Sequence, residues 1–597
     1  EKTQSPPSGP PLGGVAAGMS SRKAAAIRAP VEEDDAAGDS ETDSGEEDEE
    51  GESGSDAETL LQRVRALRWV PIGFCSAVAI GMVCWFLVWP AAFQAVGAPA
   101  QLWQTALSTG DLLARKTDVA FVPDFAFDGP EVLLGEETVS NADTAIVGFG
   151  GAFTESAALV LQRLSPELRA RVLEGYFGPD GLGYTLGRVH INSCDFSTEN
   201  YAFDNVDGDL NLTYFDTNVT RDTKALIPFI LSAQDALRSQ GKVLQLFATP
   251  WSPPAWMKTN LQMDHSGKPC LRSGMEATWA MYFAKWVSAY KEHGIPLWAI
   301  TVQNEPENNA TWEGCVFTAE EATDFLATHL GPTMRALHPE VRIFAYDHNK
   351  DHVYEWAKAT YSNPLAAQYV TGIAFHWYSG DSFDAVRHVH AEFPQAVLLP
   401  SEATYERWKW HAGASLETGE WSFGEGYAHD IIGDLNAGAV GWTDWNLLLD
   451  EKGGPNHVDN VCDAPMMANF SRGELYFHPQ YYFIGHFSKF ILPGSLRLRS
   501  TVWGTSRYRG RSAYACWGAD GKKLPDSSTC RGYGVCTEED GLEVTSFLRP
   551  DGLVAAVVLN CGGSAITFKL RESARAAEVI IPPHAIQTYL IRREGHA

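Results

Sequence analysis

Short apolar runs recur along the middle of the chain, and a polar or aromatic residue closes each of them. Eight such runs begin near residues 145, 185, 242, 297, 341, 372, 396 and 438. Stretches with helical spacing lie between most of them, for example at 165–177, 223–241, 274–294 and 318–337. Apolar strands that alternate with amphipathic helices are typical of a parallel sheet covered by helices. The pattern predicts a (β/α)8 TIM barrel over residues 141–488. The alternative is an open doubly wound sheet, which the lack of a GxGxxG after any strand disfavours.

The periodicity changes on both sides of this region. After about residue 490, strand-like segments are separated by turn signals such as Pro550-Asp551-Gly552. Residues 117–140 follow a similar pattern. We predict an all-β sandwich domain built from segments before and after the barrel. Residues 99–140 would supply a linker and the first strands, and residues 489–597 the remainder, with an insertion near 505–540.

The N-terminal region contains one long uncharged apolar segment, residues 69–89. Twenty-one such residues are enough to span a bilayer as an N-terminal transmembrane helix. Trp69 and Trp89 stand at its ends, and Arg63, Arg65 and Arg68 precede it. We therefore predict a signal-anchor over residues 63–98, with a type II orientation that leaves everything after it lumenal or extracellular. The alternative is a late signal peptide that is cleaved near residues 95–100.

Charge is concentrated near the N-terminus. The net charge is −29, and residues 32–58 hold fifteen Asp or Glu and no Lys or Arg. Residues 1–62, rich in acids, Pro, Gly and Ser, are expected to form a disordered cytosolic tail. The remaining chain is only mildly acidic, so nucleic acid is not an expected partner.

Two features agree with a lumenal location for the region after the apolar segment. Candidate glycosylation sites occur there at Asn211, Asn218, Asn309 and Asn469. Eight of the ten cysteines also follow the segment, and Cys516, Cys530 and Cys536 lie close together in sequence. Their spacing does not suit zinc, so disulfide bonds are the preferred interpretation, with the connectivity left open.

Polar and aromatic side chains follow the predicted strands, at the end of a barrel where active sites form. These residues are Glu155, Asp195, Trp251, Asn304, Glu305, Asp347, His376, Trp377, Tyr378, Glu402, Asp444, Trp445 and Asn446. The sequence has no GxSxG, no P-loop and no evident metal-binding cluster, so no cofactor is expected. Two carboxylates among aromatic rings are what glycoside hydrolysis requires, since one must donate a proton and the other must stay ionised. A lone carboxylate at such a place is more often a helix cap, but Glu305 and Glu402 follow the fourth and seventh strands together.

Several motifs in order resemble those of the lysosomal acid β-glucosidases, or glucosylceramidases, of glycoside hydrolase family 30. They are "GFGGAFTES", "TPWSPPAWMKTN", "QNEPE", "AFHWY", "PSEA" and "VGWTDWNLLLD". The resemblance runs from about residue 117 to the C-terminus. It implies a barrel whose acid/base is Glu305 and whose nucleophile is Glu402.

The resemblance also implies roles for other residues. Asn304 would hold the sugar 2-hydroxyl, and Asp195, Trp251, Trp377, Asp444 and Trp445 would contact the glucosyl ring. Arg188, His376, Tyr378 and Asn460 would complete the substrate-binding site. Cys194 and Cys315 would be free thiols, although the residues alone allow a disulfide. The chain departs from the family at His190, where proline is usual, and at Thr404, where cysteine is usual.

The expected function is hydrolysis of glucosylceramide to glucose and ceramide by a retaining β-glucosidase. A glycolipid substrate and a membrane are the expected partners, with an activator protein or an anionic lipid as a further candidate. The expected location is the secretory or endolysosomal system. Two alternatives stay open: a related enzyme on a steryl glucoside or β-glucan, and a non-catalytic glycolipid-binding protein.

Overall fold

The structure of the protein, a computed structural model, describes residues 95–406, 415–505 and 532–593. The predicted tail, residues 69–89 and both Cys516 and Cys530 lie outside these ranges. Within them, none of the helices has the length and apolar character that crossing a membrane would require.

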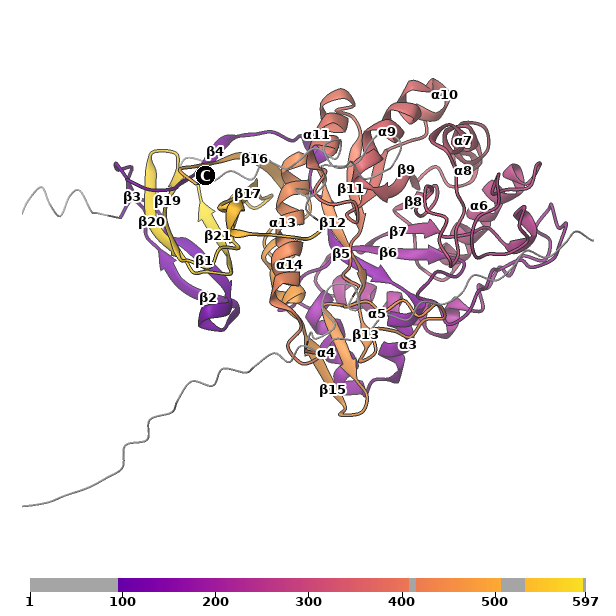
Figure 1. The fold of residues 1–597 in the computed structure, drawn as a ribbon, viewed down its shortest axis with the longest axis horizontal. Coiled ribbons are helices and arrows are strands. Elements are labelled where there is room, and N and C mark those ends of the chain that lie inside the picture. The colour runs from indigo at the N-terminus through magenta and orange to yellow at the C-terminus, as the bar shows by residue number, and fades with distance from the viewer. Residues whose placement is uncertain (1–94, 407–414, 506–531, 594–597) are drawn as a thin grey trace, which may run out of the picture. The chain divides into compact units, whose positions relative to one another are not determined.

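Eight parallel strands form the central sheet, in the order β11-β10-β9-β8-β7-β6-β5-β12 (Figure 1). Their bounds are β5 Gly148–Phe153, β6 Leu186–Ile191, β7 Gln245–Pro250, β8 Ala299–Thr301, β9 Arg342–Asn349, β10 Gly372–His376, β11 Val397–Glu402 and β12 Gly441–Asn446. A parallel bridge between Leu398 and Ala439 joins the two ends of the sheet. The predicted barrel is therefore confirmed, and the open sheet is excluded.

Helices follow most of these strands and cover the barrel. They are α3 Glu155–Arg163, α4 Pro166–Phe177, α5 Leu226–Arg238, α6 Glu276–Glu292, α7 Ala319–Phe325, α8 Gly331–Leu337, α9 Val353–Ser362, α10 Pro364–Ala367, α11 Phe383–Glu392, α13 Trp421–Ala437 and α14 Pro479–Ser488. A capping box begins α7, inside the predicted helical stretch 318–337: the Thr318 hydroxyl accepts from the Glu321 amide, and the Glu321 carboxylate accepts from the Thr318 amide.

The inside of the barrel changes character along its axis. Its apolar layer consists of Leu186, Phe247, Ala299, Phe344, Ala374 and Leu399. Side chains on one face of a strand recur every two residues, so the next inward layer lies two residues further along each strand. Most side chains of this layer are polar. Arg188 of β6, Thr249 of β7, Thr301 of β8, His376 of β10 and Ser401 of β11 occupy this polar layer. The strands therefore place buried polar groups directly beneath the barrel mouth.

Two irregularities in the sheet redirect side chains at the ends of the strands. In β9 the pairing with β10 skips one residue after Tyr346, and both Tyr346 and Asp347 have positive φ values, of 72° and 76°. In β11 the pairing skips from Pro400 to Glu402. Such bulges re-aim side chains next to active sites. Here they bring Asp347 and Glu402 into the polar layer, although strict alternation would place them elsewhere.

The second domain is a ten-stranded sheet in the order β2-β1-β21-β18-β17-β16-β4-β19-β20-β3. Its strands are β1 Ala100–Ala106, β2 Asp111–Val119, β3 Val122–Pro123, β4 Glu131–Thr138, β16 Leu496–Trp503, β17 Leu542–Leu548, β18 Leu553–Asn560, β19 Ile566–Glu572, β20 Arg575–Ile581 and β21 Ala585–Arg592. In Figure 1 the indigo strands that precede the barrel lie among the yellow strands that follow it. The pairing of β1 with β21 and of β4 with β16 confirms the predicted contact between the two segments. A third, small sheet consists of β13 Leu449–Asp450, β14 Met466–Asn469 and β15 Glu474–Phe477.

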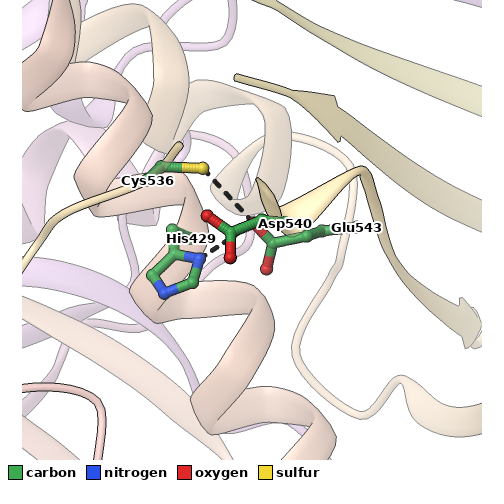
Figure 2. Close-up of side chains that lie close together, drawn as sticks. All are labelled: His429, Cys536, Asp540 and Glu543. Carbon is green, nitrogen blue, oxygen red and sulfur yellow. Dashed lines mark hydrogen bonds and ion pairs between the residues drawn. The ribbon is translucent and has the colours of Figure 1, made fainter. Parts of the chain in front are cut away.

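A buried ionic contact joins α13 of the barrel to β17 of the sandwich. Figure 2 shows His429 directed at Glu543, and His429 Nδ1 lies 2.8 Å from Glu543 Oε1. Burial lowers the pKa of His429, but the carboxylates of Glu543 and Asp381 raise it well above its usual value overall. The neighbouring sulfur of Cys536 is bonded to Cys561, so it is not available as a metal ligand. The cluster is a salt bridge between domains.

Candidate active site

A cavity of about 400 Å³ opens at the carboxyl ends of the barrel strands. Eight of the residues predicted for the site line it: Asp195, Trp251, Asn304, Glu305, Tyr378, Glu402, Trp445 and Asn460. They come from loops and strand ends spread over 265 positions of sequence. The fold thus gathers most of the predicted site into one cavity.

Glu402, the last residue of β11, is held on two sides. Arg188 Nη1 donates to Oε2, and the Tyr378 hydroxyl donates to Oε1 over 2.9 Å. The side chain is 8% exposed and borders the cavity. These two donors fix the orientation of the carboxylate, as a nucleophile requires.

Arg188 donates from its guanidinium to four side chains, those of Thr249, Glu402, Asn304 and Asp347. Besides Glu402, its Nη2 donates to Asn304 Oδ1 over 2.9 Å and to Asp347 Oδ2 over 3.0 Å. Since Arg188 can only donate, the group that faces it on Asn304 is the amide oxygen. The Asn304 amide nitrogen is then left for the cavity, where it could donate to a sugar hydroxyl.

Asp347, which the sequence pattern placed at a strand end but to which it gave no role, is the polar centre beneath the cavity. Its Oδ2 accepts from Thr249 over 3.1 Å and from Thr301 over 2.7 Å, while His376 Nε2 lies 3.0 Å from Oδ1. Burial raises the pKa of Asp347, but Arg188 and His376 lower it far below its usual range. A permanently ionised Asp347 balances the charge of Arg188 and fixes the orientation of His376.

Glu305 lies just after β8 with a φ of +47°, a strained conformation for a residue with a side chain. Asn308 Nδ2 donates to its Oε2 over 2.8 Å. His376 Nδ1 lies 3.4 Å from Glu305 Oε1 and 3.9 Å from Glu402 Oε1. The two predicted catalytic carboxylates therefore converge on one imidazole nitrogen.

The pKa of Glu305 reflects this histidine environment. Burial raises it, but the contact with His376 and the charges of His348 and His376 lower it to about 2. For His376, burial lowers the pKa, whereas Glu402, Asp347 and Glu305 raise it to about 9. In the free protein at neutral pH the proton of this pair therefore resides on His376.

Aromatic rings and a carboxyl form another wall of the cavity. Trp251 and Trp445 stack with centroids 5.2 Å apart at an angle of 26°. Asn460 Nδ2 donates to Asp195 Oδ2 over 3.0 Å. Burial and the charge of Glu402 raise the pKa of Asp195 well above its usual value. Indole faces and a hydrogen-bonding carboxyl are complementary to a pyranose ring.

Four predicted site residues lie behind the cavity surface. Arg188 and His376 lie beneath it and act through Glu402 and Glu305. Trp377 is buried among Tyr405, Tyr427 and Trp442, and Tyr427 donates from its hydroxyl to Asp444 Oδ1 over 2.7 Å. Trp377 and Asp444 therefore do not border the cavity in the described structure, and their contact with a glucosyl ring stays a prediction.

The two departures from the family pattern are accommodated locally. His190 Nδ1 donates to the Asn192 carbonyl over 2.6 Å, and Nε2 accepts from the Glu155 amide over 3.1 Å. Thr404 lines the cavity and donates to the Asp463 carbonyl over 3.2 Å. Neither change touches Glu305 or Glu402 directly.

The structure corrects one expectation about cysteines. Cys194 is a buried free thiol, as expected, but Cys315 forms a disulfide with Cys270, with the Cα atoms 5.4 Å apart. The expectation for Cys315 was wrong because the loop after β7 carries Cys270 back to the loop after β8. Cys536 pairs with Cys561, which agrees with the preference for disulfides over zinc.

Three of the four glycosylation candidates, Asn211, Asn218 and Asn309, are exposed. Asn309 also accepts from the Ser266 amide over 2.7 Å through its side-chain oxygen, which leaves its nitrogen free of this bond. Asn469 is only 8% exposed, and its nitrogen donates to the Tyr476 hydroxyl over 3.4 Å. The folded structure therefore favours glycan attachment at the first three positions.

Some residues at the cavity were missed by the reasoning from sequence. They are Glu307, Asn308, Trp312, His348, Asn349, Glu406, Cys462 and Tyr533. Glu307 and Asn308 directly follow the "NEP" motif, so their closeness to Glu305 in sequence could have identified them as candidates. Tyr533 comes from the sandwich segment, and no local sequence pattern connects it to the barrel.

Comparison with known proteins agrees with this geometry. Residues 146–491 match the Glycosyl hydrolase family 30 TIM-barrel domain, and residues 532–589 match the Glycosyl hydrolase family 30 beta sandwich domain. The lysosomal acid glucosylceramidase of Mus musculus is 34% identical over 459 residues, which cover 75% of this chain and 81% of the mouse protein. An endo-1,6-beta-D-glucanase of Trichoderma harzianum, BGN16.3, is 25% identical over 472 residues, or 76% of this chain and 86% of its own.

Among solved structures, that of SrfJ from Salmonella typhimurium matches with a TM-score of 0.71 and 31% sequence identity. The match covers 83% of this chain and all of the SrfJ chain. Sequence, domain order and fold agree, and the chain is a member of glycoside hydrolase family 30.

Proposed function

We propose that the protein is a retaining β-glucosidase that hydrolyses glucosylceramide to glucose and ceramide. The observation that carries the proposal is the convergence of Glu305 and Glu402 on His376 at the base of one cavity. Retaining glycosidases need two carboxyl groups close enough to act on opposite sides of one anomeric carbon. Glu305 Oε1 and Glu402 Oε1 lie 3.4 Å and 3.9 Å from the same nitrogen, His376 Nδ1. These two carboxylate oxygens are therefore at most 7.3 Å apart.

In the first step, a Glu402 oxygen attacks the anomeric carbon and the bond to the ceramide oxygen breaks. Arg188 and Tyr378 orient the attacking carboxylate. Asn304, whose oxygen is fixed by Arg188, donates to the sugar 2-hydroxyl. The sugar ends as an ester on Glu402, and ceramide leaves with a proton from Glu305.

That proton comes from His376. The pKa of Glu305 near 2 and that of His376 near 9 place it on the imidazole before substrate binds. As negative charge develops on the leaving oxygen, Glu305 takes this proton from His376 Nδ1, 3.4 Å away, and passes it to that oxygen. Asp347, bonded to Nε2, stabilises the histidine throughout.

In the second step, ionised Glu305 takes a proton from water, and the water oxygen attacks the anomeric carbon. The ester bond breaks, glucose is released with retained configuration, and Glu402 becomes a carboxylate again. The proton held by Glu305 returns to His376, because ionised Glu402 once more raises the pKa of that imidazole.

The choice of glucosylceramide is supported by similarity to proteins with that name. A specific observation supports β-1,6-glucan as the second candidate, since the glucanase of Trichoderma harzianum covers a similar share of this chain at lower identity. We further propose a lumenal enzyme of the secretory or endolysosomal system, anchored through residues 63–98 and assisted by an anionic lipid or an activator protein. The domain limits 99–140, 141–488 and 489–597 belong to the same proposal.

Parallel assays of the purified full chain in detergent would test the substrate. Glucosylceramide, a steryl glucoside and a β-1,6-glucan would be compared, with Glu402→Gln as the inactive control. Turnover of glucan without turnover of glycolipid would overturn the substrate choice. Labelling with a cyclitol epoxide tests the mechanism, because the epoxide should attach covalently to Glu402 of a retaining enzyme. A non-catalytic glycolipid-binding protein would not be labelled.

A further inference from the structure

Glu313, in the loop after β8, is a buried carboxylate that faces His457. It is 1% exposed, and neither carboxylate oxygen makes a hydrogen bond of regular geometry in the described ranges. Burial raises its pKa, and the nearby Ser193 side chain, His457 and its own backbone amide offset only part of that rise. The buried ammonium of Lys258 lies in the adjoining loop but donates to the carbonyls of Met263, His265 and Gly314 over 2.6–2.7 Å. These three hydrogen bonds occupy all three N–H donors of the Lys258 ammonium, so no N–H of Lys258 is left to donate to Glu313. A buried carboxylate in this condition is stabilised either by a proton or by a neighbouring positive charge.

His457 turns its Nε2 toward this carboxylate. Its Nδ1 lies 2.9 Å from the Ser197 carbonyl oxygen, which can only accept, so Nδ1 carries the hydrogen. Nε2 then presents a lone pair, and it lies 3.5 Å from Glu313 Oε1. Metal-binding histidines are commonly oriented in this way, with the second ring nitrogen donating to a backbone carbonyl.

The separation of 3.5 Å between His457 Nε2 and Glu313 Oε1 is compatible with a metal ion bound between them. Charge-assisted N–H···O hydrogen bonds are about 2.7–2.9 Å long, so a proton alone would draw the two groups closer. Two ligands of one tetrahedral zinc ion, each about 2.0–2.2 Å from the metal, are roughly 3.3–3.5 Å apart. The observed distance fits two ligands of one ion.

Asp264 supplies a third donor from another loop. One ligand atom from each of Asp264, Glu313 and His457 lies within 4.8 Å of the other two. A backbone bridge between Asp264 and Glu313 fixes their relative position, and Asn200 Nδ2 donates to Asp264 Oδ1 over 2.6 Å. Asp264 and His457 are partly exposed, so an ion has access from solvent.

We propose that Asp264, Glu313 and His457 bind a zinc-class divalent cation, with water completing the coordination. Two carboxylates and an imidazole suit such an ion. The proposed site lies outside the catalytic group of Glu305, Glu402 and His376. It is independent of the substrate choice.

The ion would brace the loops that form the barrel mouth. Trp312, next to Glu313, lines the cavity, as does Asn460, three residues after His457. Asn460 in turn donates to Asp195. Removing the ion would therefore loosen the cavity wall and weaken substrate binding while leaving the two catalytic carboxylates in place.

Zinc binding to the purified full chain tests the proposal. The protein is stripped with EDTA, dialysed against zinc chloride and analysed for bound metal. We expect one zinc per chain, binding weakened at least about tenfold in His457→Gln and Glu313→Gln, and no change in His348→Gln. His348 is the matched control because it belongs to a rival cluster with Glu305 and His376 inside the cavity.

A second measurement protects the test against misfolding of a variant. Cobalt(II) added to the unaltered protein should give the intense visible absorption of a tetrahedral site, and zinc should abolish it. Absence of stoichiometric zinc, or its loss in His348→Gln but not in His457→Gln, would overturn the proposal. Equal zinc binding by all variants would overturn it as well.

Discussion

Two buried cations in the barrel each lie between two carboxylates, yet their surroundings differ. Arg188 lies between Asp347 and Glu402, and Lys350 lies between Asp430 and Asp434. Both cations have no solvent exposure. The Lys350 group is closed further by the Trp442 indole, which donates to Asp430 over 2.9 Å.

The Arg188 group is open on one side, because Glu402 borders the cavity. The same pairing of charges can therefore serve stability or chemistry, and the direction in which the carboxylate faces decides between them. In a closed group, only the attraction between the buried charges and their hydrogen bonds offsets the free-energy cost of removing them from water. An open group keeps an oriented, charged oxygen available to an incoming molecule.

Neutralising the open carboxylate should give the largest effect. Glu402→Gln is expected to lower kcat/KM roughly 10⁴-fold or more, as removal of a catalytic nucleophile does in other hydrolases. The free energy of unfolding should change by only about 1–2 kcal/mol, because Arg188 keeps Asp347. Glycolipid assays and thermal melts measure both. Full activity in this variant would remove Glu402 from the mechanism.

Breaking the closed group should reverse the pattern. Lys350→Met leaves Asp430 and Asp434 buried without their cation and should destabilise the fold by about 3–5 kcal/mol. The kcat/KM of the molecules that remain folded should be unchanged. Denaturant unfolding and active-site titration separate the two quantities, with the exposed Lys358→Met as the matched control. A fall in kcat/KM at full stability would contradict the comparison.

Removing the histidine shared by the two carboxylates should change the pH profile. His376→Gln takes away the charge that lowers the pKa of Glu305, so that pKa should rise. In the unaltered protein the proton is lost only as the pH rises through the His376 pKa of about 9. In the variant, loss depends on Glu305 alone, and the alkaline limb of kcat/KM should move to lower pH. We expect a roughly 10–100-fold lower maximum, measured across the pH range. An unmoved alkaline limb would exclude His376 as the proton source.

An exposed ion pair provides the baseline and the smallest effect. Arg238 and Asp235 lie on the surface of α5, with side chains 69% and 71% exposed. Arg238→Ala should change neither kcat/KM nor the free energy of unfolding beyond about 0.5 kcal/mol. Chemical denaturation measures the latter. A change comparable to that in Lys350→Met would mean that burial does not set the strength of these pairs.

The comparison also shows what the sequence could reveal. Apolar runs near 145, 185 and 372 correspond to β5, β6 and β10, since continuous burial of barrel strands leaves a continuous apolar pattern. Glu305 and Glu402 were predicted as catalytic because each comes at the end of such a run, and both line the cavity. For these residues the local pattern contains the information.

The pattern placed Asp347 at a strand end but could not assign it a role. Its inward direction depends on the bulge at Tyr346 and Asp347, where two positive φ values shift the alternation by one residue. Cys315 was assigned wrongly because its partner, Cys270, reaches it only through the folded path of two loops. Trp377 and Asp444 follow strands as Glu402 does, yet they do not border the cavity. These outcomes depend on three-dimensional geometry that spacing does not encode.

The pairing of β1 with β21 has a consequence for biosynthesis. Gln101 pairs with Leu590, so the first strand of the sandwich waits for its neighbour until β21 has been synthesised. Until then β1 presents an unsatisfied backbone edge, which invites pairing with other chains. A premature stop codon shortly before β21 would therefore leave a barrel attached to a sandwich in which β1 and β18 lack the strand between them. Quality control during synthesis would thus depend on β21, a strand that carries no predicted catalytic group.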